Sequence, residues 1–302
     1  MITLANAPVS YGVFGLSRPD GVPLPTGMEL LGLVSAAGYA GIDLGEHGLF
    51  GAGQELAANL AANNVKLCGG WIDFPFVGPE EGFDNALAAA LPVLDDFALV
   101  AASQSGPAPL PTLADSGSAQ RKARPGGAPD LELQGESWRI FVERVERVAR
   151  EVRDRGLEPT FHHHVATHIE TPVEIDRFLD DTTVDLTFDT GHLLLGGGEP
   201  GTDYKRWASR INHLHLKDVD RRILAEAQVS EDPVRDVWEK RVFVPLGAGD
   251  LDMAALLEDI VSSGFDGWLV VEQDVVLLDE GDVARAVADQ IANREALRRW
   301  FP

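Results

Sequence analysis

Four short clusters of histidine and acidic residues in the second half of the chain each close an apolar, strand-like run. In chain order they are His162-His163-His164, Phe188-Asp189-Thr190-Gly191-His192, His213-Leu214-His215-Leu216-Lys217-Asp218 and Val271-Glu272-Gln273-Asp274. Imidazole nitrogens and carboxylate oxygens are common ligands of first-row divalent metal ions in proteins. Because all four clusters lie at strand ends, they predict a single divalent metal site, and we expect the function to reside there.

The spacing within each cluster supports this interpretation, because alternate side chains of a strand share one face. The residues predicted to share a polar face are His162 with His164, Thr187 with Asp189, His213 with His215 and Lys217, and Val270 with Glu272. The apolar neighbours of these residues then point toward the packed side of each strand. The pattern recurs in four strands, and we take it as evidence that the polar faces meet at one place.

We predict four metal ligands, one from each cluster: His164, Asp189, His215 and Glu272. Imidazole and carboxylate together suit Mn²⁺, Co²⁺, Fe²⁺ or Zn²⁺, and the spacing alone does not choose among these ions. His192, His162 and Lys217 are expected to contact the ligands or the substrate. Taken singly, these residues have structural explanations: a hydrogen-bonded core histidine, a helix N-cap at Asp189, or a surface ion pair at Lys217-Asp218.

Three further residues near predicted strand ends are candidates for substrate binding beside His162. They are Asn6, Glu46 and Trp71. Asn6 and Glu46 offer polar side chains, and the indole of Trp71 could form an apolar wall for a ring-shaped substrate. The alternative is that these residues belong to turns and to the core.

Apolar runs alternate with helix-patterned segments along the whole chain. The expected strands are Ile2–Pro8, Gly41–Gly45, Val65–Trp71, Phe97–Ala102, Glu158–His164, Asp185–Asp189, Ile211–Leu216 and Trp268–Glu272. The expected helices lie near residues 26–37, 52–64, 80–95, 134–155, 172–181, 203–209, 251–263 and 280–299. Eight strands, each followed by a helix, predict an α/β fold, a single (β/α)8 TIM barrel domain over residues 1–302. An open doubly wound sheet is the alternative, but no G-x-G-x-x-G follows the first strand.

Two stretches interrupt this rhythm. Residues 104–130 are rich in Pro, Gly, Ser and Ala and are interpreted as a mobile loop, and residues 219–241 are charged and follow the seventh strand. Both are expected at the C-terminal rim of a barrel, where substrate loops occur. Plain surface insertions are the alternative interpretation.

The composition restricts the partners of the protein. Asp and Glu number 48 against 25 Lys and Arg, a formal charge of −23, which disfavours nucleic acid and anionic membranes. Cys68 is the single cysteine, so no internal disulfide is expected. The N-terminal residues lack the basic region of a signal peptide, and no apolar run is expected to approach the roughly 20 residues of a membrane span. We therefore expect a cytoplasmic protein, which could form a homo-oligomer.

At this point the motifs resemble the sugar isomerase/epimerase superfamily with the xylose-isomerase-like barrel, and within it the myo-inosose dehydratases. The resemblance covers nearly the whole chain, and seven segments carry it. Four are the clusters named above, with the first extended to begin at Phe161. The other three are Gly41-Ile42-Asp43-Leu44-Gly45, Gly69-Gly70-Trp71 and Gly247-Ala248-Gly249-Asp250. The resemblance implies a metal-dependent enzyme acting on a polyhydroxylated ketone. Ketose epimerases of this type carry Glu at the end of strand five, where this chain has His164, and this departure favours the dehydratase branch.

The expected chemistry is removal of a proton next to the carbonyl through a metal-stabilised enediolate, followed by loss of the β-hydroxyl. Glu272 and His192 are the candidate bases, and Lys217 is the candidate acid or oxyanion partner. The substrate is expected to be a small polyol or sugar.

Other functions remain open on the sequence alone. They are a ketose isomerase or epimerase with the same metal site, a DNA-repair endonuclease of the same barrel type, a non-catalytic sugar-binding barrel, and a Schiff-base aldolase acting through Lys217. The net charge of −23 argues against the endonuclease.

Overall fold

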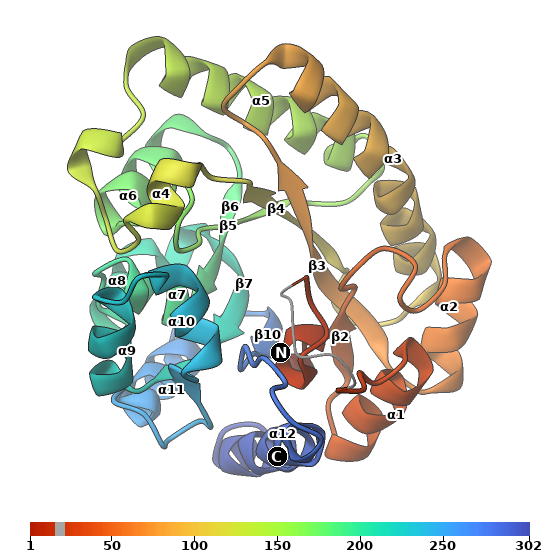
Figure 1. Cartoon of the computed structure of the whole chain (residues 1–302). Coiled ribbons are helices and arrows are strands. Elements are labelled where there is room, and N and C mark those ends of the chain that lie inside the picture. The colour runs from red at the N-terminus through yellow and green to blue at the C-terminus, as the bar shows by residue number, and fades with distance from the viewer. Residues whose placement is uncertain (16–21) are drawn as a thin grey trace.

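The apolar runs form parallel strands that satisfy their backbone groups by pairing side by side. In the computed structural model, which describes residues 1–15 and 22–302, eight strands close into a barrel surrounded by helices (Figure 1). Around the barrel the order is β1 (Ile2–Asn6), β10 (Gly267–Val271), β7 (Ile211–Leu216), β6 (Asp185–Asp189), β5 (Thr160–His162), β4 (Leu110–Asp115), β3 (Lys66–Phe74) and β2 (Gly41–Asp43). All neighbouring pairs are parallel, as a (β/α)8 barrel requires. The predicted fold class is confirmed.

Helices connect successive strands on the outside of the barrel. They are α1 (Gly27–Ala37), α2 (Gly53–Ala62), α3 (Glu80–Ser103), α5 (Gly135–Arg153), α6 (Pro172–Asp181), α7 (Thr190–Leu195), α8 (Pro200–Trp207), α11 (Met253–Ser262) and α12 (Gly281–Ala296). Four short 3₁₀ helices are η1 (Pro8–Tyr11), η2 (Pro129–Leu131), η3 (Ala208–Arg210) and η4 (Leu297–Arg299). Thr26 and Thr171 begin α1 and α6 with capping boxes, in which the threonine side chain and a glutamate three residues later satisfy two backbone N–H groups.

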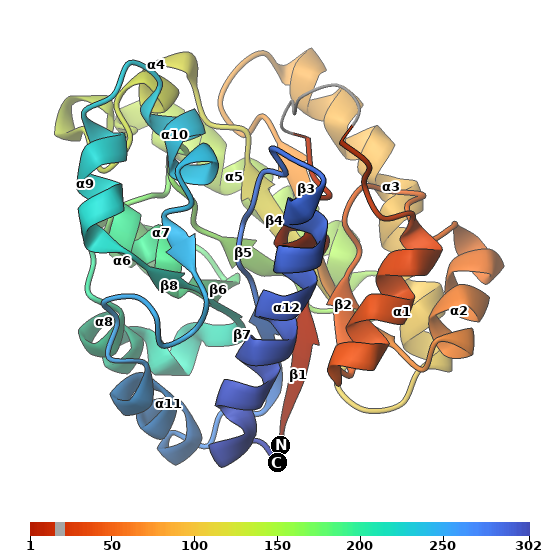
Figure 2. The same cartoon turned by 60° about the horizontal axis from the view of Figure 1, so that its bottom comes forward.

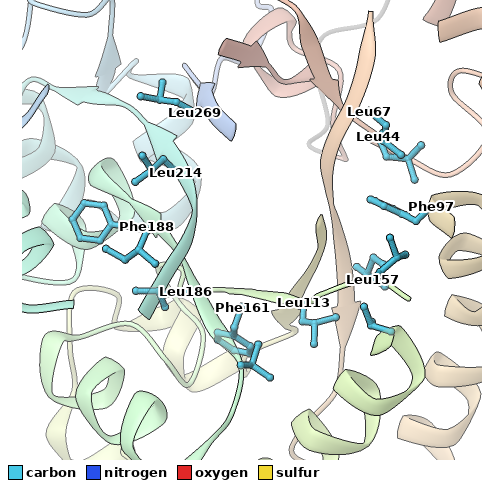
Figure 3. Close-up of a cluster of buried hydrophobic side chains, with 14 of the residues drawn as sticks. Leu44, Leu67, Phe97, Leu113, Leu157, Phe161, Leu186, Phe188, Leu214 and Leu269 are labelled. Atoms are coloured by element: carbon cyan, nitrogen blue, oxygen red, sulfur yellow. The ribbon is translucent and has the colours of Figure 1, made fainter. Parts of the chain in front are cut away.

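The main core lies between the strands and the helices. Figure 3 shows the outward-facing side chains Leu186, Phe188 and Leu214 on the helix side of the barrel wall. Phe161 of β5 contacts Phe178 of α6, with ring centroids 4.2 Å apart. The buried face of α5 repeats every three or four residues, as expected for an amphipathic helix, at Trp138, Phe141, Val145, Val148 and Val152. The alternate face of the strands carries a smaller apolar cluster, which includes Ala5, Cys68, Trp268 and Val270, together with the polar side chains of the strand ends.

The prediction of a strand at Phe97–Ala102 was wrong. These residues form the last turns of α3, in which Leu94, Phe97 and Val100 are buried at helical spacing. The fourth strand is β4, which falls inside the segment 104–130 that was interpreted as a loop. The sequence around β4 is so rich in Pro, Gly and Ser that this short strand is hidden, and the apolar end of the preceding helix was mistaken for it.

By length and composition, α3 is also apolar enough to cross a membrane, contrary to the expectation that no apolar run reaches this length. In the structure α3 packs against the barrel beside α2 and α5 (Figure 1). Its Asp84 and Asp95 side chains bind Arg147 and Arg155, the first of these on α5. The helix therefore has the environment of an outer barrel helix.

The segment after β7 forms a helical cover. It consists of α9 (Arg221–Gln228) and α10 (Pro233–Glu239) between two short antiparallel strands, β8 (Asp218–Val219) and β9 (Phe243–Val244). Asp218 closes the base of this cover by accepting backbone N–H groups of Val219, Gly247 and Gly249. Figure 2 shows α10 and the short helix α4 (Ala119–Ala123) at the end of the barrel opposite the two termini, which is where the strands end.

Candidate metal centre

Four buried side chains from neighbouring strands meet at the C-terminal end of the barrel. They are His162, which ends β5, Asp189, which ends β6, His215 of β7, and Glu272, which follows β10. One ligand atom from each lies within 4.8 Å of the corresponding atoms of the others. Catalytic residues of this barrel type stand at the same end of the strands.

The distances between these atoms fit a single small cation. His162 Nε2 lies 3.3 Å from Asp189 Oδ2 and 3.2 Å from His215 Nδ1, and His215 Nδ1 lies 3.0 Å from Glu272 Oε2. Ligand bonds of about 2.0–2.2 Å in a tetrahedral arrangement place neighbouring ligand atoms roughly 3.3–3.6 Å apart. Two imidazoles and two carboxylates in this spacing fit a divalent transition-metal ion.

The structure brings His162, rather than the predicted His164, to this group. The side-chain alternation that paired the two histidines holds only within a strand, and β5 ends at His162. Beyond it the chain turns, and the His164 backbone N–H donates to Ile169 O. The His164 ring lies against that of His192, with centroids 3.6 Å apart. His164 therefore borders the site without joining the other three predicted ligands.

Lys217 places an ammonium group against the same carboxylates. Its Nζ lies 2.7 Å from Asp189 Oδ2, 2.5 Å from Glu272 Oε2 and 3.3 Å from Asp274 Oδ1, and the side chain is only 1% exposed. Burial disfavours the charged amine, but the attraction of Asp189, Asp274 and Glu272 outweighs it and holds the pKa of Lys217 well above its usual value. The lysine is thus protonated in the ion-free protein and places a positive charge beside the candidate ion site.

The remaining charges of the group are coupled. Burial opposes the charged form of His215, but Glu272 and Asp189 outweigh it and raise its pKa to about 10. Burial alone would raise the pKa of Asp189 and of Glu272. The charge of Lys217 nevertheless holds the pKa of Asp189 below its ordinary value, and His215 together with Lys217 lowers the pKa of Glu272. Both carboxylates are therefore ionised and available as ligands.

His192 differs from His215 because it stays neutral. Burial first, and then the charge of Lys217, hold the pKa of His192 well below its usual value. Neither ring nitrogen has a hydrogen-bond partner within the described parts of the chain, and Nε2 lies 3.6 Å from Asp274 Oδ2. A neutral imidazole with an available lone pair can accept a proton from a substrate.

Two indoles flank these histidines. Trp71 of β3 is 41% exposed, and its ring meets His162 and His164 edge-on with centroids 5.4 and 5.1 Å away. Trp238 of α10 lies nearly parallel to His164, and its Nε1 donates to Asp274 Oδ2 at 3.2 Å. The sequence reading assigned no role to Trp238 or Asp274. A tryptophan inside a charged insertion after the seventh strand was the available signal.

Two predicted substrate contacts lie elsewhere. Asn6 is fully buried in β1, where its Nδ2 donates to Gln290 Oε1 of α12 at 2.9 Å. Because this bond turns the amide toward the helix, Asn6 supports the packing of α12. Glu46 is exposed on the turn after β2, and its carbonyl accepts the N–H of Leu49. Trp71 and His162 are thus the predicted substrate contacts that the structure places at the site.

Known proteins resemble this chain in both sequence and fold. The rhizopine catabolism protein MocC of Rhizobium meliloti is 35% identical over 144 residues, and an inosose dehydratase of Lacticaseibacillus casei is 34% identical over 142 residues. The aligned segments make up 47% and 46% of this chain, and 44% and 48% of these two relatives. The match thus spans about half the length of the curated relatives.

Solved structures match almost the whole fold at low sequence identity. The 3-keto-D-glucoside 4-epimerase YcjR of E. coli has a TM-score of 0.66 at 13% identity, covering 98% of this chain and 100% of that one. The probable 3-DHS dehydratase AsbF of Bacillus anthracis has a TM-score of 0.65 at 13% identity, covering 98% of both chains. A family model described as the xylose isomerase-like TIM barrel matches residues 31–294, and the chain therefore belongs to the xylose isomerase-like TIM barrel family.

Proposed function

We propose that the protein is a divalent-metal-dependent carbohydrate lyase that dehydrates a cyclic polyhydroxy ketone of the inosose type. The observation that carries this proposal is the buried group of His162, Asp189, His215 and Glu272, with the Lys217 ammonium against its two carboxylates. The curated relatives named inosose dehydratase support the substrate class. A Mn²⁺ or Co²⁺ cofactor and a cytoplasmic location belong to the same proposal.

A bound ion would be held by the four residues of that group and would act as a Lewis acid on the substrate carbonyl. His192 accepts the proton next to the carbonyl, because it is neutral and its ring nitrogens have no hydrogen-bond partner among the residues that the structure describes. Lys217 donates a proton from Nζ to the departing β-hydroxyl, which leaves as water. Glu272 is the alternative base, although its contact with Lys217 keeps it a weak one.

The same first step serves an isomerase or epimerase, which returns the proton to carbon. Inversion at a carbon calls for a second base on the opposite face of the substrate. The residue at the end of β5 is His162, whose pKa is lowered by burial and which faces Asp189. We therefore favour dehydration, in which one base and one acid suffice.

The decisive experiment combines metal analysis with product analysis. Purified protein is stripped with chelator, reloaded separately with Mn²⁺, Co²⁺ or Zn²⁺, and incubated with inososes and ketohexoses in deuterated water. A new enone absorbance supports the dehydratase, whereas deuterium in an intact sugar indicates an isomerase or epimerase. Absence of both products with every ion and substrate would contradict the proposed function.

Three variants test the assigned roles. Asp189→Asn is expected to lose metal binding and turnover, and His192→Gln is expected to lose turnover by roughly 10²–10⁴-fold while still binding the ion. Lys217→Met is expected to lose turnover likewise, and full activity would remove Lys217 from the mechanism. Lys205→Met is the matched control, because Lys205 pairs with Asp259 on the surface, with 63% of its side chain exposed.

A further inference from the structure

The second ring nitrogen of His215 faces a carboxylate that none of the roles above uses. Asp43 ends β2, and its Oδ2 lies 3.5 Å from His215 Nε2, while His215 Nδ1 faces Glu272 on the other side of the ring. Asp43 and His215 are both buried inside the barrel. The imidazole therefore stands between two carboxylates, one beside each nitrogen, and Asp43 is the carboxylate nearest to Nε2, which has no hydrogen-bond partner among the described residues.

The backbone around Asp43 makes room for this contact. The pairing of β2 with β3 shifts register between Ile42 and Asp43, so that Asp43 stands opposite Gly69. Such an irregularity changes the direction of a side chain. A Cβ on Gly69 would lie 2.7 Å from Asp43 Oδ1 and 3.1 Å from His213 Nε2. Any residue larger than glycine would therefore push the Asp43 carboxylate from its position. The other carboxylate oxygen of Asp43, Oδ1, accepts a hydrogen bond from the Cys68 thiol, with 3.2 Å between the oxygen and Sγ.

We propose that Asp43 is a positioning residue that selects the tautomer of His215 required for metal binding. A neutral imidazole carries one proton, and it can bind an ion only through the nitrogen that lacks it. A proton on Nε2, facing Asp43, leaves the lone pair on Nδ1, facing His162, Asp189 and Glu272. Carboxylate partners of this kind fix the orientation of metal-binding histidines, and losing one typically costs 10–100-fold in metal affinity.

This inference rests on the metal centre of the proposed function, so its test measures ion binding without turnover. Asp43→Leu and Asp43→Asn are compared with wild type for Co²⁺ affinity and stoichiometry, using calorimetry and the visible absorbance of bound Co²⁺. Asp73→Asn is the matched control, since Asp73 faces Ser116 Oγ at 2.7 Å near the end of β3. Near-ultraviolet circular dichroism checks folding, and Asp43→Asn retains the shape of the side chain if Asp43→Leu does not fold.

The tautomer itself is read from histidine ¹⁵N shifts of the Zn²⁺-loaded protein, with the His215 signal assigned by its loss in His215→Gln. We expect one ion per chain, a proton on Nε2 in wild type, and an affinity at least tenfold lower in Asp43→Leu, with a smaller loss in Asp43→Asn. An affinity within fivefold of wild type in both variants would overturn the inference.

Two other results would also overturn it, and they differ in meaning. Two ions per chain, one of them lost in Asp43→Leu, would make Asp43 a ligand of a second ion beside His213, which is buried with both ring nitrogens unbonded in the described structure. A wild-type protein that binds no divalent ion would refute the metal centre and the proposed function with it.

Discussion

Replacing Lys217 by Met should destabilise the ion-free protein strongly. The substitution preserves most of the side-chain volume and removes the Lys217 ammonium, which lies within 3.3 Å of Asp189, Glu272 and Asp274. A unit-charge pair 2.7 Å apart attracts with about 6 kcal/mol at an effective dielectric constant of 20, and part of this offsets the cost of burying the charges. Breaking a buried ion pair by removing one partner typically costs about 3–5 kcal/mol, and we expect a loss of unfolding free energy in this range.

The assay is urea denaturation followed by fluorescence and far-ultraviolet circular dichroism, with chelator and then with excess Mn²⁺. A bound ion at 100 times its dissociation constant stabilises the native state by about 2.7 kcal/mol. In Lys217→Met the gain should be larger than in wild type, because no ammonium competes for the oxygens that the ion needs. A loss below about 1 kcal/mol without metal, similar to that of the surface control Lys205→Met, would refute this account of the charges.

Three further predictions concern the core, the contact of Trp238 with Asp274, and the buried His163. Phe161→Ala should lower the unfolding free energy by about 3–5 kcal/mol, measured by urea denaturation, because Phe161 is fully buried against Phe178. Trp238→Phe should lower kcat/KM about fivefold with an unchanged urea midpoint, because it removes the hydrogen bond to Asp274, worth about 1 kcal/mol, while keeping an aromatic ring; unchanged kinetics would show that the bond is dispensable. Stability should fall as the pH drops below about 6.5, because burial lowers the pKa of His163 to about 3 and the unfolded chain then binds the proton more tightly. Between neutral pH and pH 5 this histidine alone should cost about 2 kcal/mol, and urea midpoints that are flat over this interval would contradict it.

The barrel was predictable because most of its strands are short apolar runs between amphipathic helices. The error at the fourth strand has a local cause, since β4 contains Pro111 and lies in a stretch whose composition is that of a loop. The end of α3 offered a more apolar run only a few residues earlier. Local composition could not distinguish a helix end from a strand, because the choice depends on which run pairs with β3 and β5.

The site was predictable to the extent that it follows from strand ends. Asp189, His215 and Glu272 come together because parallel strands of a barrel end on one side. Choosing between His162 and His164 required the point at which β5 stops, and side-chain periodicity does not mark that point. Trp238 is brought to Asp274 by a helix outside the barrel, so no periodic pattern in the sequence indicates the contact.

The helical cover after β7 has a practical consequence for engineering the protein. Both of its ends meet at Asp218, next to Lys217 in the chain, while the barrel strands continue undisturbed beneath it. Residues 220–242, between β8 and β9, lie outside the barrel strands, so changes of sequence and length that would disrupt a strand are tolerable here, because an exchanged segment inherits the same anchor. Exchanging this segment is expected to alter the side of the site that Trp238 lines, while the clustered residues at the strand ends, His162, Asp189, His215 and Glu272, keep their places.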